Sequence, residues 1–240
     1  MPRPSLHIFA GLIIACVALS GCRIEAGTGS TVPPPTLGLD GTWFGAMEDP
    51  DGTLFTLEWR IQGEHLIREV VAGQPSGARG ELWRVAPGQL EGVLSDGTWV
   101  RLLVSGDRRH ALLVTDLFEF AVLTRDALTL PRFQFADLDG RWRGRQAWAD
   151  WFDGEVVRAS AFCGAGTCEI LADDGVITDL VLTQLDRTYG LYRGGYADSL
   201  GDSGIAGALV SADLLFMGTY SCPIDYLFPE DCTFGAFSFD

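Results

Sequence analysis

The strongest constraint on the fold is a strict two-residue alternation of apolar and polar side chains. Within residues 53–61 the apolar members of this pattern are Phe55, Leu57, Trp59 and Ile61. A period of two is produced by an antiparallel strand that has one face in a core and the other in water. Elsewhere no segment combines a helical period with capping residues. The pattern therefore predicts an all-β chain.

Pairs of Asp and Gly recur at strand-length intervals and predict tight turns between short strands. These pairs are Asp51-Gly52, Asp96-Gly97, Gly106-Asp107, Asp153-Gly154 and Asp174-Gly175. Residues 90–124 predict four consecutive strands, of which the last three are 98–104, 109–115 and 118–124. Residues 147–152 are open to two interpretations, a helical turn or the mouth of a barrel. Antiparallel meanders are the expected architecture.

The chain contains an internal repeat. Leu-Asp-Gly-Thr-Trp-Phe-Gly at 39–45 recurs as Leu-Asp-Gly-Arg-Trp-Arg-Gly at 138–144, and Phe-Glu-Phe-Ala at 118–121 is similar to Phe-Gly-Ala-Phe at 234–237. A repeat of this length indicates two related structural units. We expect two tandem β units, 38–131 and 132–240, packed as one body.

The Leu-x-Gly-x-Trp opening of each unit resembles the first strand of calycins, the lipocalin and avidin group, and of bacterial lipocalin-like lipoproteins. The resemblance implies two calycin-like barrels in which Trp43 and Trp142 pack across one end. It covers residues 39–45 and 138–144, and later calycin signatures such as the Thr-Asp-Tyr triplet are missing. No family activity is therefore carried over.

Residues 1–21 have the features of a secretory signal: one early cation (Arg3), an uncharged apolar stretch, and small residues before a cleavage point. The apolar stretch is shorter than the roughly 20 residues of a transmembrane helix. Leu-Ser-Gly-Cys, ending at Cys22, resembles the lipobox of bacterial lipoproteins, and the resemblance implies a lipid-modified Cys22 at the mature N-terminus. An ordinary signal peptide with an incidental cysteine is the alternative.

Arg23, instead of aspartate, follows Cys22, and by resemblance to enteric lipoproteins this favours the outer membrane. Residues 22–37 are rich in Gly, Ser, Thr and Pro, so we expect a tether between the membrane and the β units. The membrane is thus an expected partner through the N-terminal lipid.

The chain is acidic, with 17 Arg and Lys against 32 Asp and Glu and a net charge of −15. This balance argues against nucleic-acid or anionic-lipid binding by the folded part. Two interpretations stay open: solubility within a polyanionic envelope, and attraction to a basic protein partner.

Four cysteines remain after the signal and the lipid site are set aside: Cys163, Cys168, Cys222 and Cys232. An even number in an exported chain predicts disulfides, and four cysteines allow three pairings. Residues 164–167 make an easy tight connection, which favours Cys163–Cys168 and Cys222–Cys232. A zinc site is the alternative, but the spacings are poor and no histidine lies beyond His110.

Catalytic signals are weak. His65 and His110 lie at the starts of predicted strands, where we expect exposed or edge positions and no metal site. Gly-Asp-Ser-Gly at 201–204 resembles the nucleophile segment of trypsin-like proteases, but neither histidine has the required sequence context. A turn between strands is the expected structure there.

Acidic residues cluster in four places: Glu48-Asp49-Pro50-Asp51, Asp173-Asp174, Asp198 with Asp202, and Glu230-Asp231. Three interpretations are open: solvated loops, calcium at Asp49/Asp51 or Asp198/Asp202, and a glycosidase-like pair. Aromatic residues also gather, at Trp148, Trp151 and Phe152 and at Tyr189, Tyr192 and Tyr196. These are expected in barrel cores, with some at an open end.

We expect a non-catalytic, envelope-anchored binding or interaction module without cofactor or metal. A lipocalin-like carrier of a hydrophobic molecule predicts a barrel cavity lined by Phe55, Leu57 and Trp59. An inhibitor of a basic envelope-attacking enzyme, similar to periplasmic lysozyme inhibitors in size and β class, predicts filled barrels and an acidic loop. A carboxylate-based hydrolase and a purely structural role are further alternatives, and the oligomeric state stays open.

Overall fold

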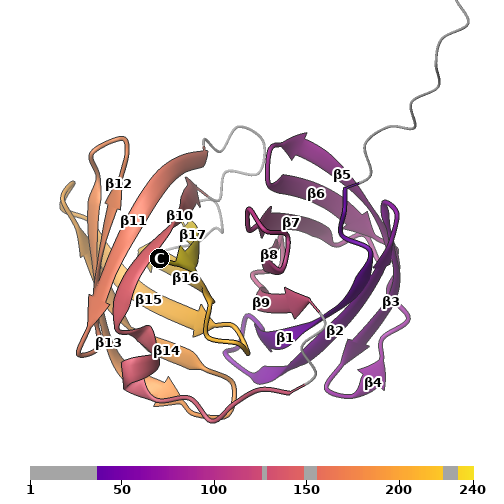
Figure 1. The fold of residues 1–240 in the computed structure, drawn as a ribbon, viewed down its shortest axis with the longest axis horizontal. Coiled ribbons are helices and arrows are strands. Elements are labelled where there is room, and N and C mark those ends of the chain that lie inside the picture. The colour runs from indigo at the N-terminus through magenta and orange to yellow at the C-terminus, as the bar shows by residue number, and fades with distance from the viewer. Residues whose placement is uncertain (1–36, 126–128, 149–155, 224–231) are drawn as a thin grey trace, which may run out of the picture. The chain divides into compact units, whose positions relative to one another are not determined.

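The computed structural model describes residues 37–125, 129–148, 156–223 and 232–240. They belong to one compact unit and form two closed antiparallel barrels of eight strands each (Figure 1). This confirms the predicted all-β fold with two tandem barrel units. Within the described ranges, no helix has the length and apolar character needed to span a lipid bilayer.

The first barrel joins its strands in chain order, and its last strand pairs with its first. Its strands are β1 (Gly41–Glu48), β2 (Leu54–Gln62), β3 (His65–Val71), β5 (Gly80–Ala86), β6 (Gln89–Leu94), β7 (Trp99–Val104), β8 (His110–Thr115) and β9 (Phe120–Arg125), and the short β4 (Gln74–Pro75) pairs with β3. The four strands predicted within 90–124 are β6 to β9. On β2, Leu57, Trp59 and Ile61 are buried, which confirms the alternation.

The second barrel repeats this arrangement after a single turn of 3₁₀ helix, η1 (Phe135–Leu138). Its strands are β10 (Gly140–Trp148), β11 (Val156–Gly164), β12 (Thr167–Ala172), β13 (Ile177–Asp186), β14 (Leu191–Asp198), β15 (Ser203–Val210), β16 (Phe216–Pro223) and β17 (Thr233–Phe239). Residues 147 and 148 end β10, so the helical alternative is wrong for them; residues 149–152 lie outside the described residues.

Both repeat tryptophans occupy the same place in their barrels. Trp43 Nε1 donates to the main-chain carbonyl of Leu39 at 2.8 Å, and Trp142 Nε1 donates to that of Leu138 at 2.9 Å. Both indoles are buried. Each indole N–H therefore has a hydrogen-bond acceptor in the residues just before its strand, as a buried indole requires.

The predicted alignment of residues 118–121 with residues 234–237, at the closing strands of the two barrels, is wrong by two residues. Gly45 pairs with Leu123 in the first barrel, and Gly144 pairs with Phe237 in the second. Leu123 therefore corresponds to Phe237, and Phe120 corresponds to Phe234. A shift of two residues keeps every side chain on the same face of the strand, which explains why the sequence patterns still look alike.

The strands close on each other tightly at two glycines. A Cβ atom on Gly45 of β1 would lie 1.8 Å from the Val122 carbonyl oxygen, and one on Gly144 of β10 would lie 1.9 Å from that of Ala236. Contacts this short are sterically forbidden. These positions therefore admit only glycine where the first and last strands of each barrel meet.

Three of the predicted turns bend in the same way. Gly52, Gly97 and Gly175 all have φ between 82° and 96°, a left-handed conformation that glycine adopts readily. The preceding aspartate accepts a hydrogen bond from the main-chain N–H two residues later in each case. Residues 106–107 also lie in a turn, whereas residues 153–154 lie outside the described residues.

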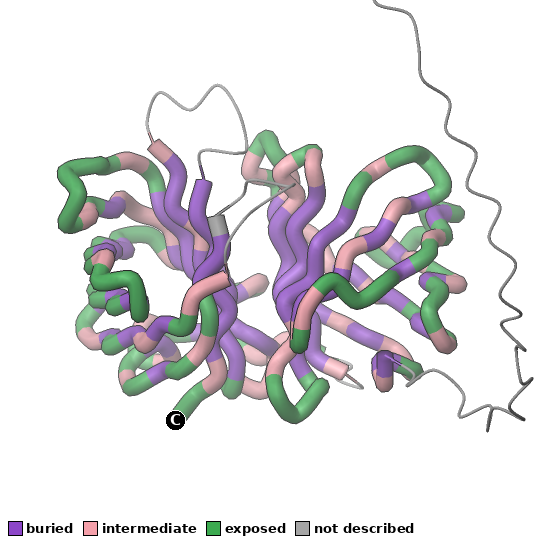
Figure 2. The backbone as a smooth tube through the Cα atoms, turned by 90° about the horizontal axis from the view of Figure 1, so that it is seen from above, coloured by how far each residue is buried: buried purple, intermediate pink, exposed green. Residues whose placement is uncertain are grey.

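Each barrel interior is filled by its own apolar cluster, and a third cluster lies between the barrels. On β9, Leu123 points into the first barrel, while Val122 belongs to the cluster between the barrels. On β16, Met217 points into the second barrel, while Phe216 belongs to the cluster between the barrels. Figure 2 shows buried positions gathered along these central strands. Strands buried on both faces lose the simple alternation, so β8 is buried along its whole length.

The disulfide prediction is confirmed. Cys163 and Cys168 are bonded across the β11–β12 hairpin, and Cys222 on β16 is bonded to Cys232 beside β17. Oxidised cysteines do not bind zinc, so the zinc alternative is wrong. Cys22, the signal and residues 22–36 of the expected tether lie outside the described residues.

Candidate functional site

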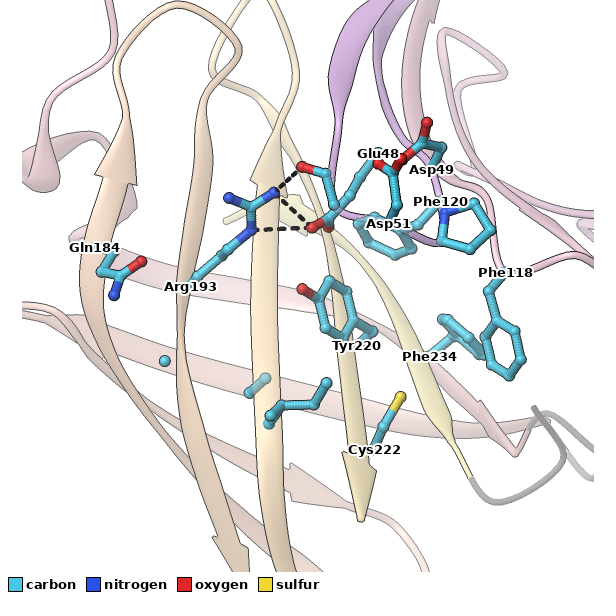
Figure 3. Close-up of a pocket in the computed structure, with 15 residues that line it drawn as sticks. Glu48, Asp49, Asp51, Phe118, Phe120, Gln184, Arg193, Tyr220, Cys222 and Phe234 are labelled. Atoms are coloured by element: carbon cyan, nitrogen blue, oxygen red, sulfur yellow. Dashed lines mark hydrogen bonds and ion pairs between the residues drawn. The ribbon is translucent and has the colours of Figure 1, made fainter. Parts of the chain in front are cut away.

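A cavity of about 390 Å³ lies where the β1–β2 turn of the first barrel meets β14, β15 and β16 of the second (Figure 3). We call it the junction cavity. Its side chains divide into an acidic loop, an aromatic wall and one cation; these are Glu48, Asp49 and Asp51, then Phe118, Phe120, Tyr220 and Phe234, and finally Arg193. Its volume lies within the range of small-molecule sites.

The cation is fixed by an ion pair between the barrels. Arg193 donates to Glu48 Oε1 from Nε at 2.9 Å and from Nη2 at 2.7 Å, and Nη2 also donates to the Gly52 carbonyl at 2.6 Å. The side chain of Glu48 is 10% exposed and that of Arg193 is 35% exposed. Burial acts to lower the pKa of Arg193, but the Glu48 carboxylate outweighs it and raises that pKa. Arg193 thus stays charged and neutralises Glu48.

The aromatic wall is built from both barrels. Phe120 of the first barrel meets Tyr220 edge to face, with ring centroids 5.1 Å apart. It also stacks against Phe234, with centroids 6.1 Å apart. Burial, together with the nearby charge of Glu48, raises the pKa of Tyr220, so its hydroxyl keeps its proton at neutral pH. The wall can pack against the apolar body of a ligand.

The acidic loop carries two further carboxylates. The Thr53 N–H donates to Asp49 Oδ1 at 2.8 Å and to Asp51 Oδ1 at 2.9 Å. Burial and a hydrogen bond to Asp51 raise the pKa of Asp49, whereas the Thr53 hydroxyl lowers that of Asp51. The two acids therefore shape their own turn and line one side of the cavity.

The other predicted acidic sites act within their turns. Asp198 Oδ1 accepts the N–H groups of Leu200 and Asp202, both at 2.9 Å. Asp173 and Asp174 lie at the β12–β13 turn. Residues 230–231 lie outside the described residues. Within the part of the chain that the structure describes, no three His, Cys, Asp or Glu side chains gather as a metal site requires.

The two histidines differ. His65 begins β3 and is exposed, as expected. For His110, at the start of β8, expected exposure is wrong: it is buried, its Nε2 lies 2.8 Å from Asp213 Oδ2, and its ring stacks on Phe216 with centroids 5.4 Å apart. The reason is that the outer face of β8 is covered by the second barrel. His110 thus links the barrels.

The remaining predicted residues lie outside the junction cavity. Leu57 and Trp59 are packed in the first barrel, and Phe55 packs against that core from a half-buried position. Residues 201 and 202 lie in a turn and Ser203 begins β15. Tyr192 and Tyr196 are inside the second barrel, Tyr189 packs against the cluster between the barrels, and residues 151–152 lie outside the described residues.

Sequence reasoning missed Arg193, Tyr220 and Phe234 as site residues. Arg193 lies 145 positions from its partner Glu48, and no local pattern announces a pairing over that distance. A usable signal was the placement of a single arginine on β14, between Tyr192 and Tyr196, which are both buried.

Comparisons with known proteins add little about function. The chain matches no family model, and no curated protein is similar to it in sequence. A solved structure from Nostoc punctiforme, a protein of unknown function from the DUF3598 family, is similar at a TM-score of 0.35 and 14% identity. The match covers 84% of this chain and 96% of that chain. A similarity this low supports no argument about function. The two closed eight-stranded barrels themselves fit a calycin-like fold.

Proposed function

We propose that this chain is a non-catalytic binding module, and that its ligand lies in the junction cavity. One observation carries the proposal: large side chains fill the barrel interiors, while the junction cavity between the barrels is open and combines aromatic, acidic and basic groups. A fold of two closed barrels is compatible with a binding role. None of the three described cavities is lined by Phe55, Leu57 or Trp59. These residues therefore do not support a carrier that holds its ligand inside the first barrel.

The chemistry of the cavity favours a ligand with an apolar body and a positive charge. Arg193 neutralises Glu48, which leaves Asp49 and Asp51 as an excess of negative charge among the residues that line the cavity. The half-buried Phe118 and Tyr220 supply ring surface, and the buried Phe120 and Phe234 support it from below. A cation held over an aromatic face gains about 0.5–1 kcal/mol at exposed sites and about 2 when desolvated.

A basic protein is a second candidate, with the module acting as an inhibitor of an envelope-attacking enzyme. It is favoured by filled barrels, by the exposed loop at Pro50 and Asp51, and by the net charge of −15. An arginine or lysine side chain of such a partner is a cation on an apolar stem, so it suits the same cavity.

A lipid anchor at Cys22 completes the proposal and places the module at the cell envelope, with the outer membrane favoured by Arg23. Support comes from the Leu-Ser-Gly-Cys sequence at the end of residues 1–22. Cys22→Ser is expected to move the protein from the membrane fraction to the soluble fraction. Continued sedimentation of the Cys22→Ser protein with membranes contradicts the anchor.

Calorimetric titration with benzyltrimethylammonium tests the cavity. We expect Asp49→Asn/Asp51→Asn to weaken binding about threefold or more, since each loss removes a charge near the cation. Asp96→Asn is the matched control, because Asp96 occupies an equivalent Asp-Gly turn that does not line the cavity. Equal affinity in all three proteins contradicts the proposed site. Native mass spectrometry of protein purified from its own envelope identifies the natural occupant.

A further inference from the structure

A second cavity, of about 340 Å³, lies on the other side of the contact between the barrels. We call it the arginine cavity. It is lined by Arg84 on β5, Arg108 in the β7–β8 turn, and Arg143 and Arg145 on β10. No Asp or Glu belongs to the described residues that line it. In a chain with 32 acidic and 17 basic residues, this is a local reversal of charge.

Most of this positive charge is not neutralised. Arg143 Nη2 lies 3.0 Å from Asp240 Oδ2, and Arg143 is largely exposed. Arg145 donates to the main-chain carbonyl of Pro87, which is neutral. Among the described residues, no carboxylate lies within ion-pair distance of Arg84, Arg108 or Arg145. All four arginines are exposed and accessible.

Two of the arginines lie close to glycine main chain, and one of them, Arg145, is also positioned by its hydrogen bond to the Pro87 carbonyl. A Cβ atom on Gly38 would lie 2.4 Å from Arg108 Nη1, and one on Gly88 would lie 3.0 Å from Arg145 Nη1. Both glycines are in the left-handed region, with φ of 71° and 73°. Guanidinium groups positioned before binding lose less conformational entropy when a ligand arrives.

The floor of the arginine cavity is apolar. Leu39, Leu90 and Phe216 line it and are buried. A cationic rim above an apolar floor is complementary to an amphiphile, a molecule that joins an anionic head to an apolar chain. Guanidinium groups bind phosphate and carboxylate oxygens through paired hydrogen bonds.

We propose that the arginine cavity binds the oxyanion head, phosphate or carboxylate, of an anionic amphiphile. The net negative charge of the chain does not prevent this, because charges beyond about 8 Å are largely screened at physiological ionic strength. The site is separate from the junction cavity and does not depend on the function proposed for it.

Octyl phosphate tests the proposal by calorimetric titration, with octyl glucoside as the neutral ligand of equal chain length. We expect octyl phosphate to bind, octyl glucoside not to bind, and Arg84→Gln/Arg108→Gln to weaken octyl phosphate about tenfold or more. Arg68→Gln/Arg187→Gln is the matched control, since both residues are exposed arginines outside the cavity. Circular dichroism verifies that both variants are folded.

Equal affinity of the two double variants, or equal binding of octyl phosphate and octyl glucoside, overturns the proposal. Vesicles then identify the source of the head group, with the Cys22→Ser protein used so that a lipid on Cys22 cannot carry it to the membrane. Sedimentation with phosphatidylglycerol but not phosphatidylcholine vesicles, lost in Arg84→Gln/Arg108→Gln, supports a membrane lipid. Binding of octyl phosphate without vesicle binding supports a soluble amphiphile. Unchanged binding of octyl phosphate by Asp49→Asn/Asp51→Asn separates this site from the junction cavity.

Discussion

Phe120 and Phe234 hold the same position in the closing strands of their two barrels, and their rings stack on each other with centroids 6.1 Å apart. Corresponding surfaces of the two units therefore face one another across the apolar cluster between the barrels. This explains how a tandem repeat forms one body: each unit buries the outer face of its closing strand against the other.

Gly218 of β16 makes this close contact possible. A Cβ atom there would lie 2.7 Å from side-chain carbons of both Leu112 and Val122 in the first barrel. We expect Gly218→Ala to lower the free energy of unfolding by about 1–3 kcal/mol, as overpacking usually does. Urea denaturation measures this. Gly106→Ala is the control, because a Cβ at that turn meets no atom within 4 Å; equal losses in both proteins contradict the explanation.

The ion pair between Glu48 and Arg193 is expected to stabilise the folded chain. Its contribution is measured as the coupling free energy between the two side chains. Arg193→Met removes the cation and leaves a buried carboxylate, so we expect a loss of about 1–3 kcal/mol in the free energy of unfolding. Glu48→Gln in the same chain is expected to recover part of that loss, because the buried charge is then absent. Chemical denaturation of the two single variants and the double variant forms the cycle. Strictly additive effects show that the two side chains do not interact.

Trp43 and Trp142 are expected to contribute to stability through their indole N–H groups and their volume. Trp43→Phe and Trp142→Phe each remove a buried hydrogen bond and leave a carbonyl without its donor, at a cost of about 2–4 kcal/mol. Trp99→Phe is the control, since Trp99 is 46% exposed. Thermal and urea unfolding compare the three. A loss in Trp99→Phe as large as in the other two contradicts this account.

Asp213 gives the contact between the barrels a defined acid sensitivity. Burial acts to raise its pKa, but hydrogen bonds with His110 and Ser211 and the charge of His110 outweigh this, so its pKa is lowered. A carboxyl whose folded pKa is lowered stabilises the fold above its unfolded pKa, about 3.9, and loses that contribution as pH falls through the folded value.

We therefore expect the free energy of unfolding of the native chain to fall more steeply below about pH 4 than that of Asp213→Asn. Urea midpoints measured from pH 6 to pH 3 test this. Asp173→Asn, an exposed aspartate of the second barrel, serves as the reference. Parallel pH profiles for the native chain and Asp213→Asn exclude Asp213 as the source.

The strand pattern, the turns and the repeat are predictable from sequence because they depend on local chemistry. Asp40 and Asp139 of the repeated Leu-Asp-Gly motif also have the same role. Asp40 accepts a hydrogen bond from the main-chain N–H of Gly63 in the β2–β3 turn, and Asp139 accepts one from that of Ala165 in the β11–β12 turn. The local disulfide pairing follows from the same kind of reasoning, because short loops close easily.

The candidate sites are not predictable in this way. Arg193 meets Glu48, and His110 meets Asp213, only because two barrels pack against each other, and no periodicity within one strand reports on that contact. The arginine cavity has the same origin, since two of its cations come from each barrel. The net charge of the chain suggests a surface without affinity for anions, but a net charge does not describe where the 17 basic and 32 acidic residues lie.

The pairing of first and last strands, at Gly45 and at Gly144, sets an order of events during folding. Neither barrel closes until its final strand, β9 or β17, has been made and can lie against them. The first barrel can therefore close before the second, and Phe120 and Val122 remain uncovered until β16 and β17 pack against them. A chain stopped after residue 125 exposes this apolar strip permanently, so it is a target for chaperones and aggregation in a way that the finished protein is not.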